Sequence, residues 1–262
     1  MGQESQNEQE VPVLLLVGGL GTRLQSVLPN SPKPLAPLGP TPFLRLLVEQ
    51  LSSQGFRHLI MCTGHLAAQI EQEFGDGGQM DVVIDYSRES NPLGTAGAVK
   101  LAERYLSGAP EFVVMNGDSF LEVDFAQLLR FHRDHGGMAS MAARRVPDAA
   151  RYGTLEVDDQ LRVTAFREKT GERAPGLING GVYVFNRELL RYIPDGVPAS
   201  LEQDIFKRVL RHGVYASEQQ GIFIDIGTPE DYARAQTLYE SLQTAARVKA
   251  SQKASGIADT SI

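Results

Sequence analysis

The chain has 262 residues, of which 42% are hydrophobic and 22% are charged, and its formal net charge is -7. This composition is ordinary for a soluble globular protein and fits one large α/β domain or two small ones, whereas an acidic surface does not favour nucleic acid or anionic lipid. The single cysteine, Cys62, excludes an intramolecular disulfide and a cysteine-rich zinc site. Residues 1–10 lack the features of a signal peptide, and no segment reaches the roughly 18 apolar residues of a membrane span. We therefore expect a cytoplasmic protein without membrane partners.

The first half of the chain alternates continuous apolar runs with amphipathic stretches. Continuous apolar runs predict strands that are buried on both faces, and apolar residues at helical spacing predict helices between them. The predicted strands span residues 13–17, 59–62, 82–86 and 112–115, and the predicted helices cover residues 67–74, 96–106 and 125–135 and a stretch from Phe43 that ends at Gly55. This order indicates a mostly parallel sheet with helices on both faces.

The second half of the chain has short apolar runs that are separated by Gly and Asp turns. The runs at residues 138–143, 153–157, 163–166 and 181–185 predict antiparallel strands added to the same sheet. They are followed by a capping box at Ser200 and Gln203 that opens a helix through Leu210, a strand at residues 223–226 and a last helix capped by residues 228–231. We expect one domain over residues 11–242, with a disordered N-terminus over residues 1–10 and a disordered tail over residues 243–262.

Two loops carry residues that are suited to binding phosphate. In open α/β sheets, ligands bind beyond the carboxyl ends of the strands, and the first such end reads Gly18-Gly19-Leu20-Gly21-Thr22-Arg23-Leu24. Glycines let backbone N–H groups approach phosphate oxygens, and Arg23 adds positive charge. The loop lacks the third glycine of the dinucleotide fingerprint and the end of a P-loop, so by itself it also fits a simple tight turn. The second loop, Ser31-Pro32-Lys33-Pro34-Leu35, places a lysine between two prolines that stiffen the backbone.

Together, the two loops resemble the signature of the sugar-1-phosphate nucleotidyltransferases. The resemblance continues in order over about residues 11–242, through Gly94-Thr95-Ala96-Gly97, Asn116-Gly117-Asp118, Phe166-Arg167-Glu168-Lys169, Asn179-Gly180-Gly181-Val182-Tyr183, Ser200-Leu201-Glu202-Gln203-Asp204 and Asp225-Ile226-Gly227-Thr228-Pro229. Arg151-Tyr152-Gly153, the 225–232 segment and the short length look most like the guanylyltransferases that act on D-glycero-D-manno-heptose 1-phosphate. The resemblance implies a Rossmann-like, three-layer α/β/α fold with a mostly parallel mixed sheet.

The resemblance also implies a magnesium-dependent reaction in which a sugar 1-phosphate attacks the α-phosphorus of a nucleoside triphosphate and releases pyrophosphate. Such a reaction depends mainly on positioning and charge neutralisation, and Mg²⁺ takes one or two carboxylates plus phosphate oxygens. By resemblance, Asp118 and Asp225 are the metal ligands. Each has a structural alternative, since Asp118 also fits a turn carboxylate and Asp225 an acid placed just before a helix N-terminus.

Further roles are implied in the same way. Arg23 and Lys33 would hold the triphosphate and the leaving pyrophosphate, Lys169 the sugar phosphate, and Asn179 and Glu202 the sugar hydroxyls, while Tyr152, Gly153 and Gly180 would shape the sugar pocket. The other implied substrate-binding residues are Gly18, Gly19, Gly21, Thr22, Gly94, Thr95, Asn116 and Glu168. Lys169 also fits a surface lysine paired with Glu168, and Glu202 also fits an acid that stabilises the first turn of a helix.

The base preference depends on Glu89, which stands shortly before Gly94, where relatives place a residue that reads the base. Guanine offers two adjacent donors, N1–H and N2–H, and a carboxylate accepts from both, whereas it has no donor for O4 of uracil or thymine. Glu89 therefore favours GTP. The alternative is a solvated glutamate that pairs with Arg88.

Several functions remain open at this point. The leading hypothesis is formation of GDP-heptose from GTP, with GDP-mannose formation and transfer of UMP or dTMP as alternatives within the same class. A catalytically silent sensor of nucleotide sugars is a second class, although the chain retains the residues that catalysis requires. A dinucleotide-dependent oxidoreductase is a third class, and the incomplete glycine fingerprint argues against it. The sequence does not fix the sugar, its anomer or the oligomeric state, and a homo-oligomer is compatible with it.

Overall fold

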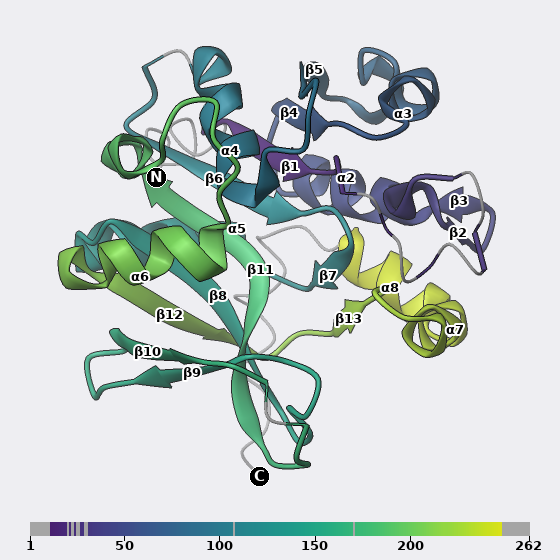
Figure 1. Ribbon diagram of the computed structural model, residues 1–262. Helices are drawn as coiled ribbons and strands as arrows, with labels where there is room; N and C mark the ends of the chain where they lie inside the picture. The colour runs from purple at the N-terminus through teal and green to yellow at the C-terminus, as the bar shows by residue number, and fades with distance from the viewer. Residues whose placement is uncertain are drawn as a thin grey trace, which may run out of the picture.

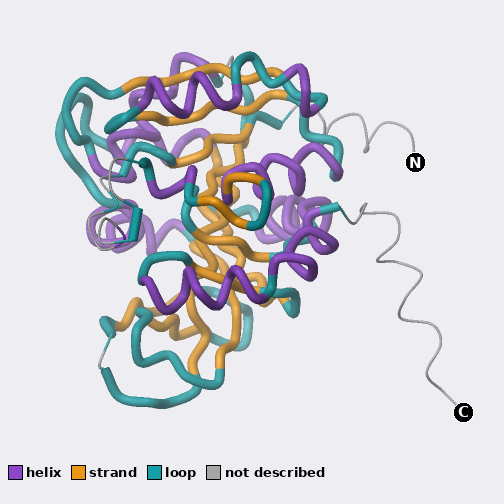
Figure 2. Tube along the Cα trace, turned by 90° about the vertical axis from the view of Figure 1, so that its right-hand side faces the viewer, coloured by secondary structure: helices purple, strands orange, loops and turns teal. Residues whose placement is uncertain are grey.

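The computed structural model describes residues 11–19, 21, 24, 27–28, 31–106, 108–169 and 171–247. A nine-stranded mixed sheet forms the centre of this part of the chain, and helices cover both of its faces (Figures 1 and 2). This arrangement confirms the predicted mostly parallel α/β sheet. The predicted disordered segments at residues 1–10 and 248–262 lie outside the described residues and stay predictions.

Four parallel strands form one half of the sheet. Strand β1 lies between β4 and β6, and β5 pairs with the outer edge of β4. Their bounds are β6 (Glu111–Asn116), β1 (Val13–Leu16), β4 (His58–Thr63) and β5 (Val83–Arg88). Because parallel strands run in the same direction, their carboxyl ends lie along a single edge, where ligands bind in open sheets of this kind.

The other half of the sheet is mixed. Strand β11 pairs antiparallel with β6 and β8, the hairpin of β9 and β10 joins β11 through β9, and β12 pairs parallel with β8. The bounds are β8 (Ala139–Val146), β9 (Thr154–Val157), β10 (Val163–Arg167), β11 (Gly176–Asn186) and β12 (Val214–Gln219). Figure 1 shows this hairpin at the opposite end of the molecule from β4 and β5.

Alternate residues of the parallel strands pack into two separate cores. Val13 and Leu15 of β1 belong to the core under α2, α3, α5, α7 and α8, whereas Leu14 belongs to the core under α4, η4, η5 and α6. The first group of helices comprises α2 (Phe43–Ser53), α3 (Ala67–Phe74), α5 (Phe125–His135), α7 (Pro229–Thr237) and α8 (Tyr239–Ala246). The second comprises α4 (Gly94–Leu101), η4 (Ala102–Tyr105), η5 (Arg187–Tyr192) and α6 (Phe206–Val209). Burial on both faces explains why the strands are continuous apolar runs.

Two small ribbons complete the fold. Strand β7 (Ser119–Leu121) pairs antiparallel with β13 (Phe223–Asp225), and β2 (Pro37–Leu38) pairs with β3 (Thr41–Pro42). The register of the first ribbon sets Asp225 opposite Ser119, and the backbone N–H of Ile226 donates to the carbonyl of Asp118 at 3.0 Å. This ribbon therefore brings together two aspartates that are far apart along the chain.

The structure departs from the predicted elements in several places, among them the short strands β2, β3 and β7 and the division of the predicted last helix into α7 and α8. Strand β12 was not predicted, and its parallel pairing with β8 makes the second half mixed rather than antiparallel. The predicted helix over residues 96–106 divides into α4 and the 3-10 helix η4. The helix after Ser200 begins as a π-helix, η6 (Leu201–Ile205), before α6. Helix α8 runs through Ala246, past the boundary expected at residue 243, because Leu242, Ala245 and Ala246 pack into the core.

The remaining 3-10 turns are η2 (Lys33–Leu35), η3 (Gly78–Met80) and η7 (Leu210–His212). Among the helices within the described ranges, none is long and apolar enough to cross a membrane.

Candidate active site

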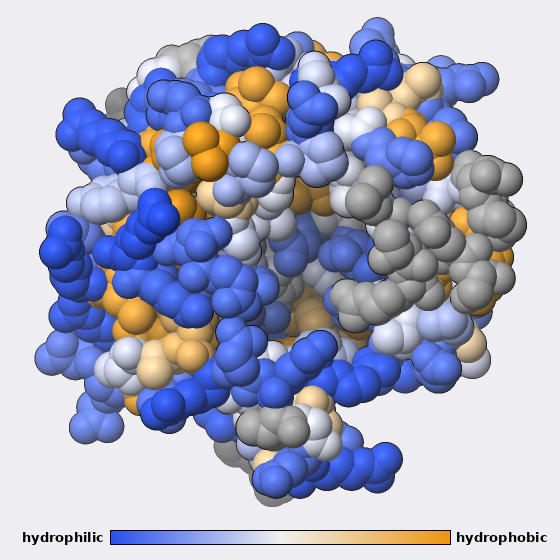
Figure 3. Space-filling model, viewed as in Figure 1, coloured by the Kyte–Doolittle hydropathy of each residue, from blue (hydrophilic) through white to orange (hydrophobic). Residues whose placement is uncertain are grey.

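A cavity of about 740 Å³ opens where the parallel strands end, and Figure 3 shows it as a hollow near the centre of one face. Its lining includes residues from the carboxyl ends of β1, β4, β5 and β6 and from η6. Of the residues predicted from the sequence, it includes Gly18, Gly19, Gly21, Lys33, Glu89, Gly94, Thr95, Asn116, Asp118 and Glu202. Thr22 and Arg23 lie outside the described residues.

Glu89 follows β5 and occupies one side of the cavity, which we call the Glu89 side. Its Oε2 accepts a hydrogen bond from the backbone N–H of Leu93 at 3.0 Å. Partial burial raises the pKa of the Glu89 carboxyl, and the hydrogen bond from Leu93 acts in the opposite direction. The neighbouring Arg88 instead pairs with Glu71 on α3, at 3.4 Å. Glu89 is therefore held in place by the backbone rather than by the ion pair considered as its alternative.

Backbone forms the wall around the Glu89 carboxylate. A Cβ atom at Gly64 would lie 2.6 Å from Glu89 Oε1, and one at Gly18 would lie 3.2 Å from the same oxygen. Such an approach leaves no room for a side chain at Gly64 unless the carboxylate moves. Gly64 was not predicted from the sequence, although it stands directly after β4, where the strand-end rule would have found it.

Cys62 also lines this side of the cavity, and it is 3% exposed. Burial raises the pKa of its thiol to about 12, and the charge of Glu89 adds to the effect. The thiolate is the nucleophilic form of cysteine, so this thiol is unreactive at neutral pH.

Lys33 lies between the two predicted metal ligands. Its Nζ is 2.8 Å from Asp118 Oδ2, and a Cβ atom at Gly227 would lie 3.5 Å from Nζ and 2.5 Å from Asp225 Oδ1. The backbone N–H of Gly227 also donates a short hydrogen bond to the Asp225 carboxylate. The prolines on either side of Lys33 place it in the short turn η2, with its side chain 11% exposed.

The electrostatics show that Asp118 and Asp225 share one environment. Burial raises the pKa of the Asp225 carboxyl most, and the nearby charge of Asp118 raises it further. The charge of Lys33 and the hydrogen bond from Gly227 lower it. A buried carboxylate close to a second carboxylate, with an ammonium group beside both, forms a site that favours positive charge.

This pair fits a hard divalent cation. Mg²⁺ is commonly bound by one or two carboxylates, with substrate phosphates and water completing its coordination. Among the described residues, no group of three or more His, Cys, Asp or Glu side chains converges to form a cage by itself. A cation at Asp118 and Asp225 would thus need further ligands from the substrate.

Another part of the cavity wall, the Glu202 side, includes Tyr183 and Glu202, which both hydrogen-bond to Asn179. Asn179 Nδ2 donates to Tyr183 Oη at 2.8 Å and to Glu202 Oε1 at 3.2 Å, and its Oδ1 accepts from the N–H of Gly181 at 3.0 Å. Enclosure in the cavity raises the pKa of the Glu202 carboxyl, and the charges of Asp118 and Glu168 raise it further. This arrangement offers acceptors and donors for hydroxyl groups beside the carboxylate pair.

Tyr183 was missed as a site residue, although it stands in the motif that carries Asn179. It lines the cavity while being only 1% exposed. Burial, followed by the charge of Glu202, raises the pKa of its phenol, so the hydroxyl stays protonated. A protonated hydroxyl can both donate and accept, which suits it to orient Asn179.

A bulge in β11 places Asn179. The pairing of β11 with β8 shifts register between Asn179 and Val182, and Gly181 has a φ of +75°, in the left-handed region that favours glycine. A Cβ atom at Gly180 would lie 2.4 Å from Leu121 Cδ2 and 2.8 Å from the carbonyl of Ala142. Gly180 thus packs against β7 and β8 and shapes the pocket only indirectly.

Gly94 and Thr95 join the cavity wall to η6. The carbonyl of Ala199 accepts hydrogen bonds from the N–H groups of Ala96 and Gly97, and the Thr95 hydroxyl accepts from the N–H of Leu201 at 2.8 Å. Gly94 has a φ of +70°, and a Cβ atom there would lie 2.5 Å from the Ala199 carbonyl. These contacts occupy the first turn of α4 and fix the segment that carries Glu202.

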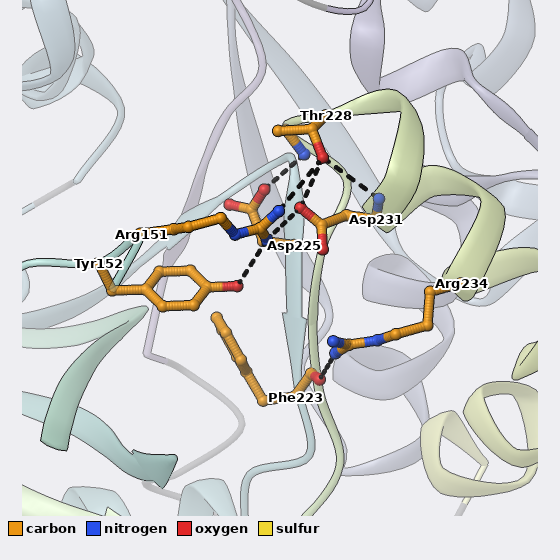
Figure 4. Close-up of polar contacts among 8 residues, drawn as sticks. Arg151, Tyr152, Phe223, Asp225, Thr228, Asp231 and Arg234 are labelled. Atoms are coloured by element: carbon orange, nitrogen blue, oxygen red, sulfur yellow. Dashed lines mark hydrogen bonds and ion pairs between the residues drawn. The ribbon is translucent and has the colours of Figure 1, made fainter. Parts of the chain in front are cut away.

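The remaining predicted residues lie outside the cavity lining, and they include Asp225, Asn179 and Gly180. Tyr152 packs edge-to-face on Phe223, with ring centroids 5.8 Å apart, and Figure 4 shows it close to Asp225. Gly153 is exposed beside β10, where a Cβ atom would lie 3.0 Å from the carbonyl of Arg167. Glu168 and Lys169 follow β10 and are exposed.

Comparison with known proteins agrees with this geometry. The profile of the family described as "Nucleotidyl transferase" matches residues 12–241. A mannose-1-phosphate guanylyltransferase from Mycobacterium tuberculosis is 37% identical over 228 residues, which are 86% of this chain and 63% of that relative. A D-glycero-alpha-D-manno-heptose 1-phosphate guanylyltransferase from Aneurinibacillus thermoaerophilus is 38% identical over 224 residues, which are 85% of this chain and 96% of that relative.

Among solved structures, HddC from Yersinia pseudotuberculosis, described as complexed with GMP-PN, superposes with a TM-score of 0.79 at 33% identity. The match covers 87% of this chain and 99% of HddC. This chain therefore spans nearly all of HddC and of the heptose-phosphate relative, but under two thirds of the mycobacterial one.

Proposed function

Because the chain belongs to the nucleotidyl transferase family, we propose that it is a guanylyltransferase that forms GDP-heptose and pyrophosphate from GTP and D-glycero-D-manno-heptose 1-phosphate. One observation carries the proposal. Glu89, the Asp118 and Asp225 pair with Lys33, and the polar Glu202 side are all parts of one site, in and beside a single cavity. The site thus offers separate places for a base, for phosphates with a cation, and for hydroxyl groups.

The Glu89 side supports guanine as the base. A carboxylate has about four acceptor positions on its two oxygens. Leu93 uses one of them on Oε2, so acceptor positions remain for both N1–H and N2–H of guanine. The relatives that match over most of their own length are also named as guanylyltransferases.

In the proposed reaction, an oxygen of the sugar phosphate attacks the α-phosphorus of GTP. The bond between that phosphorus and the oxygen bridging to the β-phosphate breaks, and pyrophosphate leaves. Asp118 and Asp225 would hold Mg²⁺, which would neutralise phosphate charge and so lower the barrier to the approach of two anions. Lys33 would move its ammonium group from Asp118 onto the phosphates, where it stabilises the leaving pyrophosphate.

The Glu202 side would bind and orient the sugar. Asn179 and Glu202 would hydrogen-bond to its hydroxyls, and Tyr183 would hold Asn179 in its present orientation. Such orientation matters because a displaced nucleophile loses much of the advantage of a bound reactant. Lys169 would reach the sugar phosphate from the end of β10. Arg23 is proposed for the triphosphate on the sequence alone.

The direct test is an assay of pyrophosphate release. Each nucleoside triphosphate is paired with a panel of sugar 1-phosphates in the presence of Mg²⁺, and we expect the highest kcat/KM for GTP with the manno-heptose phosphate. If GTP were the poorest donor, the role of Glu89 would be refuted. If no pair turned over while a nucleotide sugar bound tightly, the chain would be a sensor.

Mannose 1-phosphate is the second candidate for the sugar. It is favoured by the mycobacterial relative, whose name specifies mannose 1-phosphate. The same panel of sugar 1-phosphates distinguishes mannose 1-phosphate from the heptose phosphate, since the preferred sugar should have the higher kcat/KM with GTP. The cytoplasmic location and the homo-oligomer stay predictions that cell fractionation and light scattering would test.

A further inference from the structure

Arg151 links the loop at residues 147–153 to the N-terminus of α7. This loop joins β8 to β9 and also carries Tyr152. The guanidinium of Arg151 forms a short ion pair with Asp231, 80 residues later in the chain, and lies 3.5 Å from both Thr228 Oγ1 and Tyr152 Oη. Figure 4 shows it between the Tyr152 hydroxyl and the Asp231 carboxylate. One side chain thus contacts two segments that are remote in the sequence.

Asp231 is the buried partner in this contact. It is 5% exposed, and its Oδ2 accepts a hydrogen bond from the Thr228 hydroxyl at 2.8 Å. Its own N–H donates to Thr228 Oγ1 at 3.2 Å, which caps the helix. Asp231 lies in the first turn of α7, where the helix dipole stabilises a negative charge. A buried carboxylate also needs a direct partner. Arg151 supplies that partner.

The segment that carries Asp231 also carries Asp225. The turn between β13 and α7 contains Gly227, whose N–H donates to Asp225, and Thr228, which caps α7. On the other side, Tyr152 packs on Phe223 of β13 at a 70° ring angle. The loop and the turn are therefore joined at two points, one on each side of Asp225.

The hydroxyl of Tyr152 lies close to this turn. Burial is the main cause that raises the pKa of the Tyr152 phenol, and the charges of Asp231 and Asp225 contribute to the rise. Arg151 lowers it through its hydrogen bond and its charge. The Tyr152 hydroxyl therefore lies near Asp231, which Arg151 contacts, and near Asp225.

We propose that Arg151 is a positioning residue, whose ion pair with Asp231 holds the Tyr152 loop, and with it the sugar pocket, in a fixed relation to the turn that carries Asp225. The identity of the substrate in this inference rests on the proposed function. The coupling between the loop and the turn is independent of the proposed function. Neither Arg151 nor Asp231 needs to touch substrate for this role.

The first test is kinetic. Arg151→Met removes the charge but keeps the length of a side chain that is 49% exposed, so the core is left intact. Asp231→Asn keeps the acceptor for Thr228. We expect each variant to raise the KM for the sugar phosphate by roughly tenfold or more, because small displacements of bound groups have large kinetic effects. The KM for GTP should change by less than about twofold, and the double variant should be no worse than the poorer single variant if the two act as one unit.

The second test does not depend on turnover. Hydrogen–deuterium exchange of the parent and Arg151→Met should show faster exchange at residues 149–153 and 226–231 in the variant. Arg133→Gln is the matched control, since it breaks an exposed ion pair with Glu111 at the end of β6 away from the cavity. It should change neither the KM values nor exchange at these segments.

Three outcomes would overturn the proposal. One is a lower melting temperature in both variants with unchanged KM values and unchanged exchange in the loop, which would make the pair a simple helix cap. Another is an equal rise in KM for both substrates. The third is additivity, in which the double variant is worse than either single variant by the sum of their separate effects, as expected for two residues that act independently. If the parent itself turned over no sugar phosphate, the proposed function would fail while the exchange experiment would still decide the coupling.

Discussion

On the Glu89 side of the cavity the walls are backbone, whereas on the Glu202 side they are side chains that hydrogen-bond to one another. Gly18 and Gly64 approach the Glu89 carboxylate so closely that a Cβ atom at Gly64 would lie 2.6 Å from it. On the other side, Asn179 is placed by hydrogen bonds to Tyr183 and Glu202. Both sides join segments that are apart in the chain, but the first is built from glycine backbone at strand ends and the second from the side chains of β11 and η6.

The difference indicates how each side should respond to substitution. A backbone wall has fixed geometry, so a change at Glu89 should alter the choice of base and leave the sugar site unaffected. In a hydrogen-bonded network of side chains, several contacts hold each residue in place. A single substitution there should therefore reduce activity only in part. In the proposed reaction the carboxylates of Asp118 and Asp225 would serve both substrates, so their loss should have the largest effect.

The largest effect is expected for Asp118→Asn. The variant halves the anionic character of the carboxylate pair, and we expect kcat to fall about a thousandfold or more, since charge neutralisation of this kind is worth several kcal/mol. Steady-state pyrophosphate release measures the loss, and circular dichroism confirms the fold. Asp81→Asn is the control, because it makes the same change in an exposed pair with Arg57. Activity within about tenfold of the parent would remove Asp118 as a metal ligand.

Glu89→Gln should mainly affect the base. A glutamine has one acceptor oxygen, and if that oxygen bonds to Leu93, its NH₂ group faces the donors of guanine. We expect the preference for GTP over UTP to fall about ten- to a hundredfold, the value of one well-formed pair of base contacts. Competition between the two nucleotides measures this ratio. Glu71→Gln, which affects only the pair with Arg88, should leave the ratio unchanged, and an unchanged ratio in Glu89→Gln would contradict the base-reading role.

Lys169→Ala should weaken the binding of the sugar phosphate more than the binding of GTP. Lys169 is exposed after β10 and lies outside the cavity lining, so its role requires the loop to move inward when substrate binds. Loss of one charged contact should raise the KM for the sugar phosphate about tenfold and leave the KM for GTP nearly constant. Lys207→Ala on α6 is the control. An equal rise for both substrates would assign Lys169 to another role.

The smallest effect concerns stability. Burial and the charge of Asp118 raise the pKa of Asp225, so the folded state holds this proton more tightly than the unfolded chain does. Stability from this group is therefore present at acid pH and is lost as pH rises through the raised pKa. Without metal at neutral pH, Asp225→Asn should melt higher than the parent by on the order of 2–4 °C, the shift that 1 kcal/mol produces in a domain of this length.

Two conditions sharpen this measurement. Near pH 3.5, below the ordinary pKa of an aspartate of about 3.9, the difference in melting temperature should shrink toward zero. Adding Mg²⁺ with GTP should stabilise the parent more than the variant, because a ligand stabilises only the state that binds it. Asp159→Asn in the exposed β9–β10 turn is the control. A variant that melts below the parent in the absence of metal would show that the Asp225 charge is well compensated.

Much of the fold follows from local patterns. Continuous apolar runs located β1, β4, β5 and β6 to within two residues, because burial on both faces keeps the middle of β1, β4 and β6 apolar, while the edge strand β5 also carries polar residues. Strand β12 was missed because its buried positions include Ser217 and Gln219, whose polarity hides the strand pattern. The π-helical form of η6 was missed as well; its first residue, Leu201, donates to the hydroxyl of Thr95, which is 106 positions away in the chain.

The candidate site likewise contains residues that local sequence patterns indicate and contacts that such patterns do not show. The strand-end rule located the glycine loop after β1 and the place of Asp118 after β6, whereas the roles predicted for Glu89 and Asp118 came from resemblance to a family. Asp225 joins Asp118 only through the pairing of β7 with β13, and short strands of this kind have no local signal. The contact between Arg151 and Asp231 spans 80 residues, so no motif could reveal it. Resemblance to a family supplied what periodicity could not.

The thiol of Cys62 has a practical consequence for studying motion in this protein. It is the only cysteine in the chain, it is buried, and its pKa of about 12 keeps it protonated. A maleimide dye or spin label would therefore leave it unmodified and react with a cysteine introduced at an exposed position such as Arg173, in the loop after β10. Labels placed there could report the opening and closing of the pocket during turnover, without first removing a native thiol.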